Sequence, residues 1–324
     1  MEDEAGTTTL SPPPQAEAEP FPQVPPALAV AAVRAHPHFA ATRRRFLLAF
    51  STDPQAEGNS AAMRLLSDPG RIALFSMLVS LYFQYEPDER ATWPTIGLIR
   101  NVFLPLGLSS ARRLDAILAR LQSIGLVTLV DSPADRRLRL VLPTERMLDL
   151  DLDLLARQFS CLDGFLPDTD IGAPLRAGDR RYQRALRHVA SRTRSLAKQP
   201  LELAGRLRPI LARQDGIKLL APYLVAAHDG DPARVSLSFD NQGTRNRTSR
   251  THIRNLFGEL AELGLARQHR PGGHQVELLP ELLDLADNFV ASAISNYLRG
   301  WAIACWLVET DPRYAQYFPP TAAG

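Results

Sequence analysis

One helix-plus-hairpin pattern occurs twice in this chain of 324 residues, and it constrains the fold more than any other feature. In the first copy, residues 107–143, apolar side chains recur at the three- and four-residue spacing of an amphipathic helix. Ser109 or Ser110 can cap its start, and Gly125 ends it where the backbone turns left-handed. A strand, a polar turn and a second strand follow. The pattern predicts a helix that leads directly into a hairpin, as in a winged helix-turn-helix.

The second copy covers residues 248–265, which align with residues 109–126 without a gap. The apolar positions Leu114, Ile117, Leu118, Leu121 and Ile124 align with Ile253, Leu256, Phe257, Leu260 and Leu263. Gly264 aligns with Gly125, and Pro280 aligns with Pro143 after a hairpin tip that is two residues shorter. Repetition of a complete unit is a strong fold signal. We therefore predict a mainly α protein with small β-wings, built from tandem winged helix-turn-helix domains with terminal and linker helices.

Composition and spacing divide the chain into six segments. Residues 1–26 are acidic and rich in proline, which favours a disordered tail. The remaining segments are an N-terminal helical segment at 27–66, a first winged helix domain at 67–158, a basic linker with a helix at 159–200, a second winged helix domain at 201–290, and a C-terminal helix and tail at 291–324. The basic linker is expected either to follow DNA or to be solvated, and the run Arg43 to Arg45 either to touch phosphates or to be a solvated face.

Two helices should precede the repeated helix in each domain. In the first domain they are Arg71–Tyr85 and Thr95–Leu104, with Gly107 in the tight turn that follows. In the second domain the first helix is Ile217–Ala227, whereas residues 230–248 favour a short helix or an ordered loop. Beyond the second hairpin, apolar periodicity predicts two C-terminal helices, Glu281–Leu298 and Trp301–Val308.

Composition also excludes several classes of protein. Cys161 and Cys305 have neither disulfide nor metal spacing, so we expect a reducing compartment and a cytoplasmic location. The longest apolar run, Trp301–Val308, is too short to cross a membrane. There is no Gly-rich phosphate loop, no His-x-x-x-His and no Cys-x-x-Cys. We therefore expect no catalysis, no cofactor and no metal.

The first copy resembles the MarR family of bacterial transcriptional regulators. The family's Leu-x-x-x-Gly-Leu reads here from Leu121 to Leu126, and its wing Asp-Pro-x-Asp-Arg-Arg reads from Ser132 to Arg137 before an apolar strand and a threonine. Ser132 replaces the first wing aspartate, and the family usually has one such domain per chain. The resemblance implies DNA binding and transcriptional control. It also implies that Asp135 aims the guanidinium of Arg137 through a bidentate pair.

A helix in the major groove reads bases with side chains near its N-terminus, while a wing places cations on phosphates. The candidate DNA-binding residues of the first copy are Ser110, Arg112, Arg113, Arg136, Arg137 and Arg139. Those of the second copy are Arg245, Arg247, Arg250, His252, Arg254, Asn255, Arg267 and Arg270. Arginine can pair with guanine and asparagine with adenine, so the second helix has suitable side chains for reading bases.

These features predict a bacterial-type, sequence-specific transcriptional regulator that binds double-stranded DNA with its two winged helices as a pseudo-dimer. Two other classes stay open: a plasmid- or phage-type replication initiator with paired winged helices, and a winged-helix scaffold for protein interactions. The apolar stretch from Phe289 to Trp306 also allows a homodimer through the C-terminal helices. The sequence identifies no small-molecule effector and no membrane partner.

Overall fold

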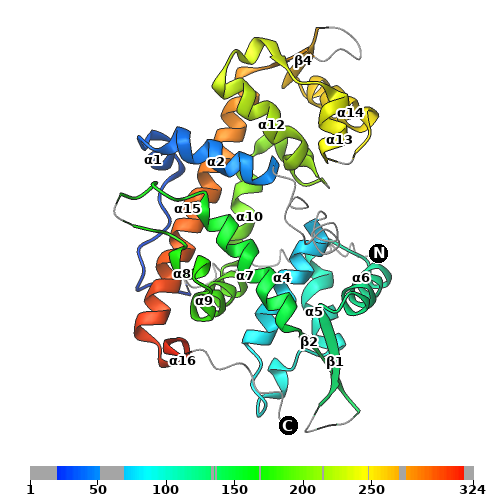
Figure 1. Ribbon diagram of the computed structural model, residues 1–324, viewed down its shortest axis with the longest axis vertical. Helices are drawn as coiled ribbons and strands as arrows, with labels where there is room; N and C mark the ends of the chain where they lie inside the picture. The colour runs from blue at the N-terminus through cyan, green and yellow to red at the C-terminus, as the bar shows by residue number, and fades with distance from the viewer. Residues whose placement is uncertain are drawn as a thin grey trace, which may run out of the picture.

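The computed structural model describes residues 20–51, 69–132, 135, 137–167, 169–213, 215–246, 248–269 and 275–316. Within these residues the protein is mainly helical and has two small antiparallel sheets (Figure 1). The predicted class, mainly α with small β elements, is confirmed. Three candidate residues, Arg136, Arg247 and Arg270, lie outside the described residues.

The first repeated region, called unit one here, contains the first copy and its neighbouring helices. Its elements are α4 (Pro69–Phe83), the 3-10 turns Arg90–Thr92 and Leu104–Leu106, α5 (Ile96–Phe103), α6 (Ala111–Ser123), β1 (Val127–Asp131), β2 (Arg139–Pro143) and α7 (Glu145–Ser160). Strands β1 and β2 pair in the antiparallel register Val127↔Pro143 to Asp131↔Arg139. Just before α5 the chain also touches the hairpin, because the Val141 N–H donates to the Pro94 carbonyl at 2.8 Å.

The second repeated region, called unit two here, has the same order of helices and hairpin strands and one additional short strand. It consists of α12 (Gly216–Asp229), the 3-10 turn Pro232–Arg234, β3 (Val235–Ser236), α13 (Phe239–Asn246), α14 (Arg250–Glu262), β4 (Ala266–Gln268), β5 (Gln275–Leu278) and α15 (Pro280–Thr310). Of the two alternatives for residues 230–248, the short helix is correct, because α13 forms there. The two-residue strand β3 was not predicted; it pairs with β5 and completes the order β3-β5-β4.

The C-terminal region is one continuous helix rather than two. Helix α15 has 31 residues and passes through Gly300 without a break, so the boundary drawn at residue 290 falls inside it. Leu298 and Trp301 are buried on either side of that glycine, and this packing keeps the segment helical although glycine disfavours it. A short helix, α16 (Pro312–Ala315), then packs against α15 and α9.

The N-terminal region lies against unit two (Figure 1). Helix α1 (Val30–Ala35) contacts α15, and α2 (Phe39–Ser51) contacts α12 and α15. The Ser295 hydroxyl donates to the Leu28 carbonyl at 2.7 Å, a contact between residues 267 positions apart. Phe21 and Val24 are buried, so the predicted disorder is wrong for this part of residues 1–26. Their apolar area is buried even though prolines surround them.

The segment between the units is also packed. Its helices are α8 (Ala173–Arg176), α9 (Arg180–Arg192), α10 (Arg194–Leu203) and α11 (Arg208–Leu211), with a 3-10 turn at Gly205–Leu207. Helix α9 packs against α15 and α4 and buries Ala185, Leu186 and Val189. The expectation of a solvated linker is therefore wrong.

Buried apolar side chains form two clusters. One holds residues of α4, α5, α6, the β1–β2 hairpin and the first half of α7. The other joins unit two to α1, α2, α9, all of α15 and the second half of α7. Unit one thus has a core of its own, whereas unit two shares its core with both ends of the chain.

Candidate nucleic-acid interface

Helices α6 and α14 begin in the same way. In α6 the Ser110 hydroxyl accepts the N–H of Arg113 at 3.3 Å, and in α14 the Ser249 hydroxyl accepts the N–H of His252 at 3.1 Å. A serine cap satisfies one of the backbone donors that a helix start leaves unpaired. Of the two serines proposed as cap for the first helix, Ser110 has this role.

The two helices also end in the same way. Gly125 and Gly264 have φ values of 72° and 69°, a region where a side chain is strained, and the leucine that follows each glycine is fully buried. The N–H of Leu126 donates to the Leu121 carbonyl at 2.9 Å, and the N–H of Leu265 donates to the Leu260 carbonyl at 2.8 Å. These are Schellman-type ends that fix the direction in which the chain leaves toward the hairpin.

An arginine caps the last turn of each helix, but it comes from a different element in each unit. Arg146 at the start of α7 donates to the Ile124 carbonyl at 3.0 Å. Arg206, from the turn before α11, donates to the Leu263 carbonyl at 2.8 Å. Ile124 and Leu263 are aligned positions of the repeat. A cation at a helix C-terminus is also favoured by the helix dipole.

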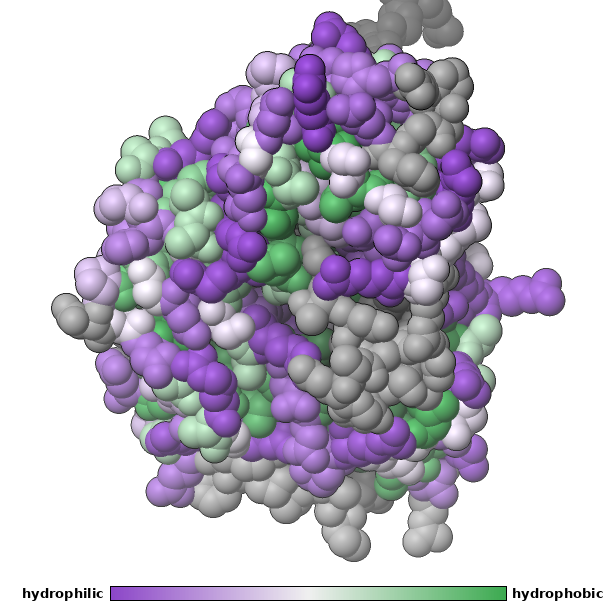
Figure 2. All heavy atoms as spheres, turned by 45° about the horizontal axis from the view of Figure 1, so that its top comes forward, coloured by the Kyte–Doolittle hydropathy of each residue, from purple (hydrophilic) through white to green (hydrophobic). Residues whose placement is uncertain are grey.

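The candidate base-reading side chains project from the starts of these helices. Ser110, Arg112 and Arg113 are exposed on α6. On α14 the side chains of Arg250, Arg254 and Asn255 are exposed, His252 is partly exposed, and Arg245 is exposed at the end of α13. Figure 2 turns the unit-two end of the molecule toward the viewer, and hydrophilic residues predominate on that face with smaller apolar areas between them.

Acidic residues that were not predicted as part of the site hold two nearby arginines. Arg250 pairs with Asp240 of α13 at 3.6 Å, and Arg100 of α5 pairs with Asp115 of α6 at 2.7 Å. Both pairs connect the helix before the turn to the helix after it. Asp240 lies within residues 230–248, for which the sequence predicts a short helix or an ordered loop, and no local pattern there indicates this contact.

Each hairpin carries an arginine that faces a carboxylate directly across the strands. Arg139 pairs with Asp131 at 3.4 Å, and Arg267 pairs with Glu277 at 3.2 Å; both are register partners. The arginine side chains are 65% and 67% exposed. Such exposed pairs contribute at most about 1 kcal/mol. These guanidinium groups therefore need little free energy to turn toward another anion.

The expected pairing of Asp135 with the Arg137 guanidinium is wrong. Asp135 instead accepts the backbone N–H of Arg137 at 3.1 Å, and its carboxylate lies 3.5 Å from the guanidinium of Arg90. A carboxylate that accepts a backbone N–H two residues ahead makes an Asx turn, which shapes the loop rather than aiming a side chain. Arg137 itself is exposed at the hairpin tip.

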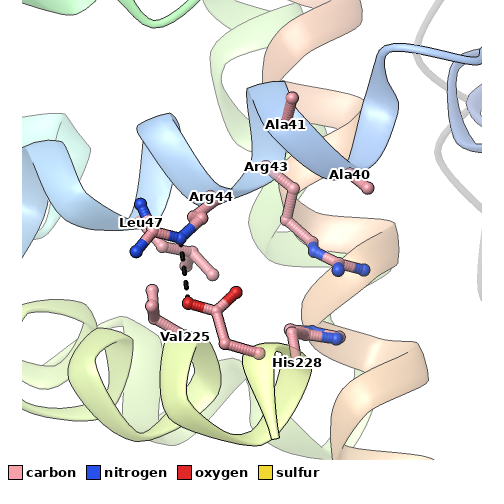
Figure 3. Close-up of a pocket in the computed structure, with 8 residues that line it drawn as sticks. Ala40, Ala41, Arg43, Arg44, Leu47, Val225 and His228 are labelled. Carbon is pink, nitrogen blue, oxygen red and sulfur yellow. Dashed lines mark hydrogen bonds and ion pairs between the residues drawn. The ribbon is translucent and has the colours of Figure 1, made fainter.

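The arginine run of α2 forms ion pairs and hydrogen bonds with other segments of the same chain. Arg43 pairs with Asp287 at 3.0 Å, Arg44 pairs with Asp229 at 2.9 Å, and Arg45 donates to the Cys161 carbonyl at 3.2 Å. Figure 3 shows Arg43 and Arg44 reaching from α2 across a pocket of about 240 Å³ toward His228 and Val225 of α12. Arg43 and Arg44 therefore hold α2 against unit two, whereas Arg45 holds it against the segment that follows α7. The expected solvated face applies to Arg44 alone, whose side chain is 53% exposed.

The basic helix α9 is likewise occupied by internal pairs. Arg187 makes a bidentate pair with Asp151 of α7, which is fully buried, and Arg180 pairs with Asp149. Gln183 donates to the Leu148 carbonyl and to Asp151, each at 2.8 Å. These charges hold α9 against α7 and are not available to follow DNA.

The thiols and the acidic and histidine side chains of the described residues bear on other kinds of site. Burial raises the pKa of Cys161 to about 12 and that of Cys305 to about 11, so neither thiol forms a ready nucleophile. Within the described ranges no group of three or more His, Cys, Asp or Glu could hold a metal ion, and no helix combines the length and apolar character that a membrane crossing requires. Comparison with protein-family models, curated proteins and solved structures finds no match to the chain.

Proposed function

We propose that this protein is a sequence-specific, DNA-binding transcriptional regulator whose two units are winged helix-turn-helix modules that act on double-stranded DNA as a pseudo-dimer. The observation that carries the proposal is the duplicated exposed surface. Both copies present arginines at the start of a serine-capped helix and a further arginine on the adjoining hairpin.

In this proposal, α6 and α14 enter the major groove. Arg112 in the first helix, and Arg254 and Asn255 in the second, contact base edges, since arginine matches guanine and asparagine matches adenine. Arg139 and Arg267 leave their cross-strand carboxylates and bind phosphates. Binding therefore depends on arginine–phosphate contacts, which displace condensed counterions and make affinity fall steeply with salt.

Selection from a randomised DNA library, followed by affinity measurement on the selected site, tests this assignment. Arg254→Ala should relax preference at one or two base pairs and cost about 1–3 kcal/mol at the best site. Arg137→Ala should weaken binding to all sequences by a similar factor, because a wing contact to phosphate carries no sequence information. Arg208→Ala, an exposed arginine outside the proposed surface, serves as the matched control and should change neither property.

Three results would contradict the proposal. Uniform loss of affinity with Arg254→Ala across the library would mean that α14 does not read bases. Absence of salt-sensitive binding to any selected DNA would favour the protein-interaction scaffold instead. Preference for iterated origin repeats over upstream promoter DNA would favour a replication initiator.

A further inference from the structure

One helix belongs to both cores. The first half of α7 places Met147 and Leu148 in the core of unit one, and its second half places Leu155 and Phe159 in the core shared by unit two. Its 16 residues span about 24 Å and contain neither glycine nor proline. A helix without such residues has no point at which it bends sharply. Motion of one unit relative to the other therefore has to disturb at least one buried cluster.

Helix α9 forms a second connection beside α7. It packs along α4 of unit one and along α15, the last helix of unit two. Its bidentate pair between Arg187 and Asp151 is buried, with exposed fractions of 10% and 0% for the two side chains. Displacing α9 would take Arg187 away from the fully buried carboxylate of Asp151, and breaking a buried pair is costly.

The long helix α15 forms a third connection, and we call α7, α9 and α15 together the frame. It begins at the end of the unit-two hairpin and extends for about 46 Å, given its 31 residues. Far from that start, Trp301 stacks on Tyr182 of α9 with ring centroids 5.2 Å apart, and it contacts Phe159 of α7 at 5.6 Å. The three helices α7, α9 and α15 thus connect the two units through packed aromatic and ionic contacts rather than through a loop.

We propose that these three helices hold α6 and α14 at one separation and orientation, so that the DNA target is bipartite with a single spacer length. The inference rests on the proposed function, because it takes α6 and α14 as the two readers of one duplex. In Figure 1 both helices lie on the right-hand side of the molecule, with the β1–β2 hairpin and the β4 hairpin toward opposite ends. The two reading surfaces are unlike, so the two half-sites are also unlike.

The helical geometry of DNA makes a fixed pair of readers sensitive to spacer length. Each added base pair moves the second half-site by about 3.4 Å and turns it by about 35° around the duplex axis. A rigid pair of readers cannot follow both changes. Readers joined by a flexible linker keep a similar effective concentration over many spacer lengths.

The first experiment measures affinity for the two selected half-sites joined by spacers that differ in steps of one base pair. We expect one optimum and a loss of at least about tenfold when two base pairs are added or removed, because one reader is then misplaced. Affinity that stays within about threefold over ten consecutive spacers, while Arg112→Ala and Arg254→Ala each weaken binding, would overturn the fixed spacing and leave the proposed function intact. If neither substitution changes affinity on any spacer, the proposed function fails instead.

A second experiment needs no DNA and tests the frame directly. Spin labels on Ala116→Cys of α6 and Ala261→Cys of α14, both exposed positions, report the distance between the two helices. Burial raises the pKa of both native thiols, so they react slowly, and the labelled wild-type chain gives the background. A single narrow distance distribution supports the frame. A broad distribution, or two separate distances, would overturn it whatever the protein binds.

Discussion

Units one and two carry the same surface pattern on different supports. Unit one surrounds a core made almost entirely from its own helices and hairpin. In unit two the aligned core includes Phe257, which stacks on Phe239 with centroids 5.6 Å apart and meets Tyr223 at 4.6 Å, and this core continues into α1, α2 and α15. The aligned position in unit one is Leu118. The serine cap, the left-handed glycine and the hairpin are therefore local features, which form on two differently built cores.

The helices before the turn differ as well. Helix α5 starts at Thr95, whose hydroxyl accepts the N–H of Leu98 at 3.2 Å. Helix α13 instead packs Gly243 tightly against the chain that enters α14: a Cβ at this glycine would lie 2.8 Å from the Thr248 carbonyl oxygen. In unit two the chain between α13 and α14 therefore passes so close to α13 that a side chain at position 243 would overlap it.

The largest expected effect concerns the connection between the units. Asp151→Ala leaves Arg187 charged and buried without its carboxylate, and we expect a loss of about 3–5 kcal/mol in the free energy of unfolding. Asp131→Ala, which breaks the exposed pair with Arg139, should cost less than about 1 kcal/mol. Urea denaturation of both variants checks the difference. Equal and small losses would mean that the α7–α9 contact does not stabilise the chain.

One glycine in α5 and one in α13 differ in the free space around them. Gly243→Ala should destabilise unit two by about 1–3 kcal/mol, because the new methyl group overlaps a backbone carbonyl. Gly97→Ala in α5 meets only Thr95 Oγ1, at 3.7 Å, and should stabilise the helix by about 0.5–1 kcal/mol. Hydrogen exchange of each unit reports these changes separately. A Gly97→Ala variant destabilised as much as Gly243→Ala would contradict this difference between α5 and α13.

The serine caps should behave alike in spite of the different cores. Ser110→Ala and Ser249→Ala each remove one capping hydrogen bond at the start of an exposed helix, and each should cost about 1 kcal/mol. Threonine at either position should retain most of the stability. Thermal unfolding of the four variants tests the equivalence, and a difference of more than about twofold between the two alanine variants would contradict it.

The smallest expected effect is a difference between the regions in how their stability depends on pH. His188 lies on α9 and contacts the rings of Phe21 and Tyr314. Its pKa is lowered to about 4, first by burial and then by the positive charges of Arg192, Arg313 and Arg184. Asp311 opposes that shift. The unfolded chain takes up this proton below about pH 6.5, so the contribution of His188 to stability is present above that pH and is lost as pH falls toward 4.

We expect a loss of about 1 kcal/mol or less between pH 8 and pH 6. None of the seven histidines lies within residues 69–160, so exchange protection should fall around α9 and α15 before it falls in unit one. His188→Phe, which cannot titrate, should remove most of the difference. A loss of protection that begins in unit one would contradict this account.

Local features of this protein could be predicted from its sequence, and long-range pairings could not. The helix around Leu114, its left-handed end at Gly125 and the following hairpin depend on residues a few positions apart, and all of them formed. The short helix α13 was one of two alternatives, because its polar composition also suits a loop. The two-residue strand β3 is too short for a periodic signal.

The arginine-rich segments show most clearly that long-range ion pairs cannot be predicted from local sequence. The arginines of α9 pair with Asp149 and Asp151, which lie more than thirty positions earlier in the chain. Arg43 pairs with Asp287 across 244 positions. A run of arginines has the same sequence pattern whether carboxylates from elsewhere neutralise it or water does. The same limit applies to Asp135, whose partner Arg90 lies before α5.

The contact between Leu28 and Ser295 affects the order in which the parts of the chain can fold during synthesis. Contacts of large sequence separation form slowly, and domains made early in translation can fold before later ones exist. The buried residues of the unit-one core all lie at or before Leu150, whereas Phe21, Val33 and Phe46 belong to the core that also contains α9 and α15. We therefore expect these N-terminal side chains to stay exposed during synthesis after unit one has folded. Pulsed hydrogen exchange during refolding should detect this order as early protection of α4 to α6 and late protection of α1 and α2.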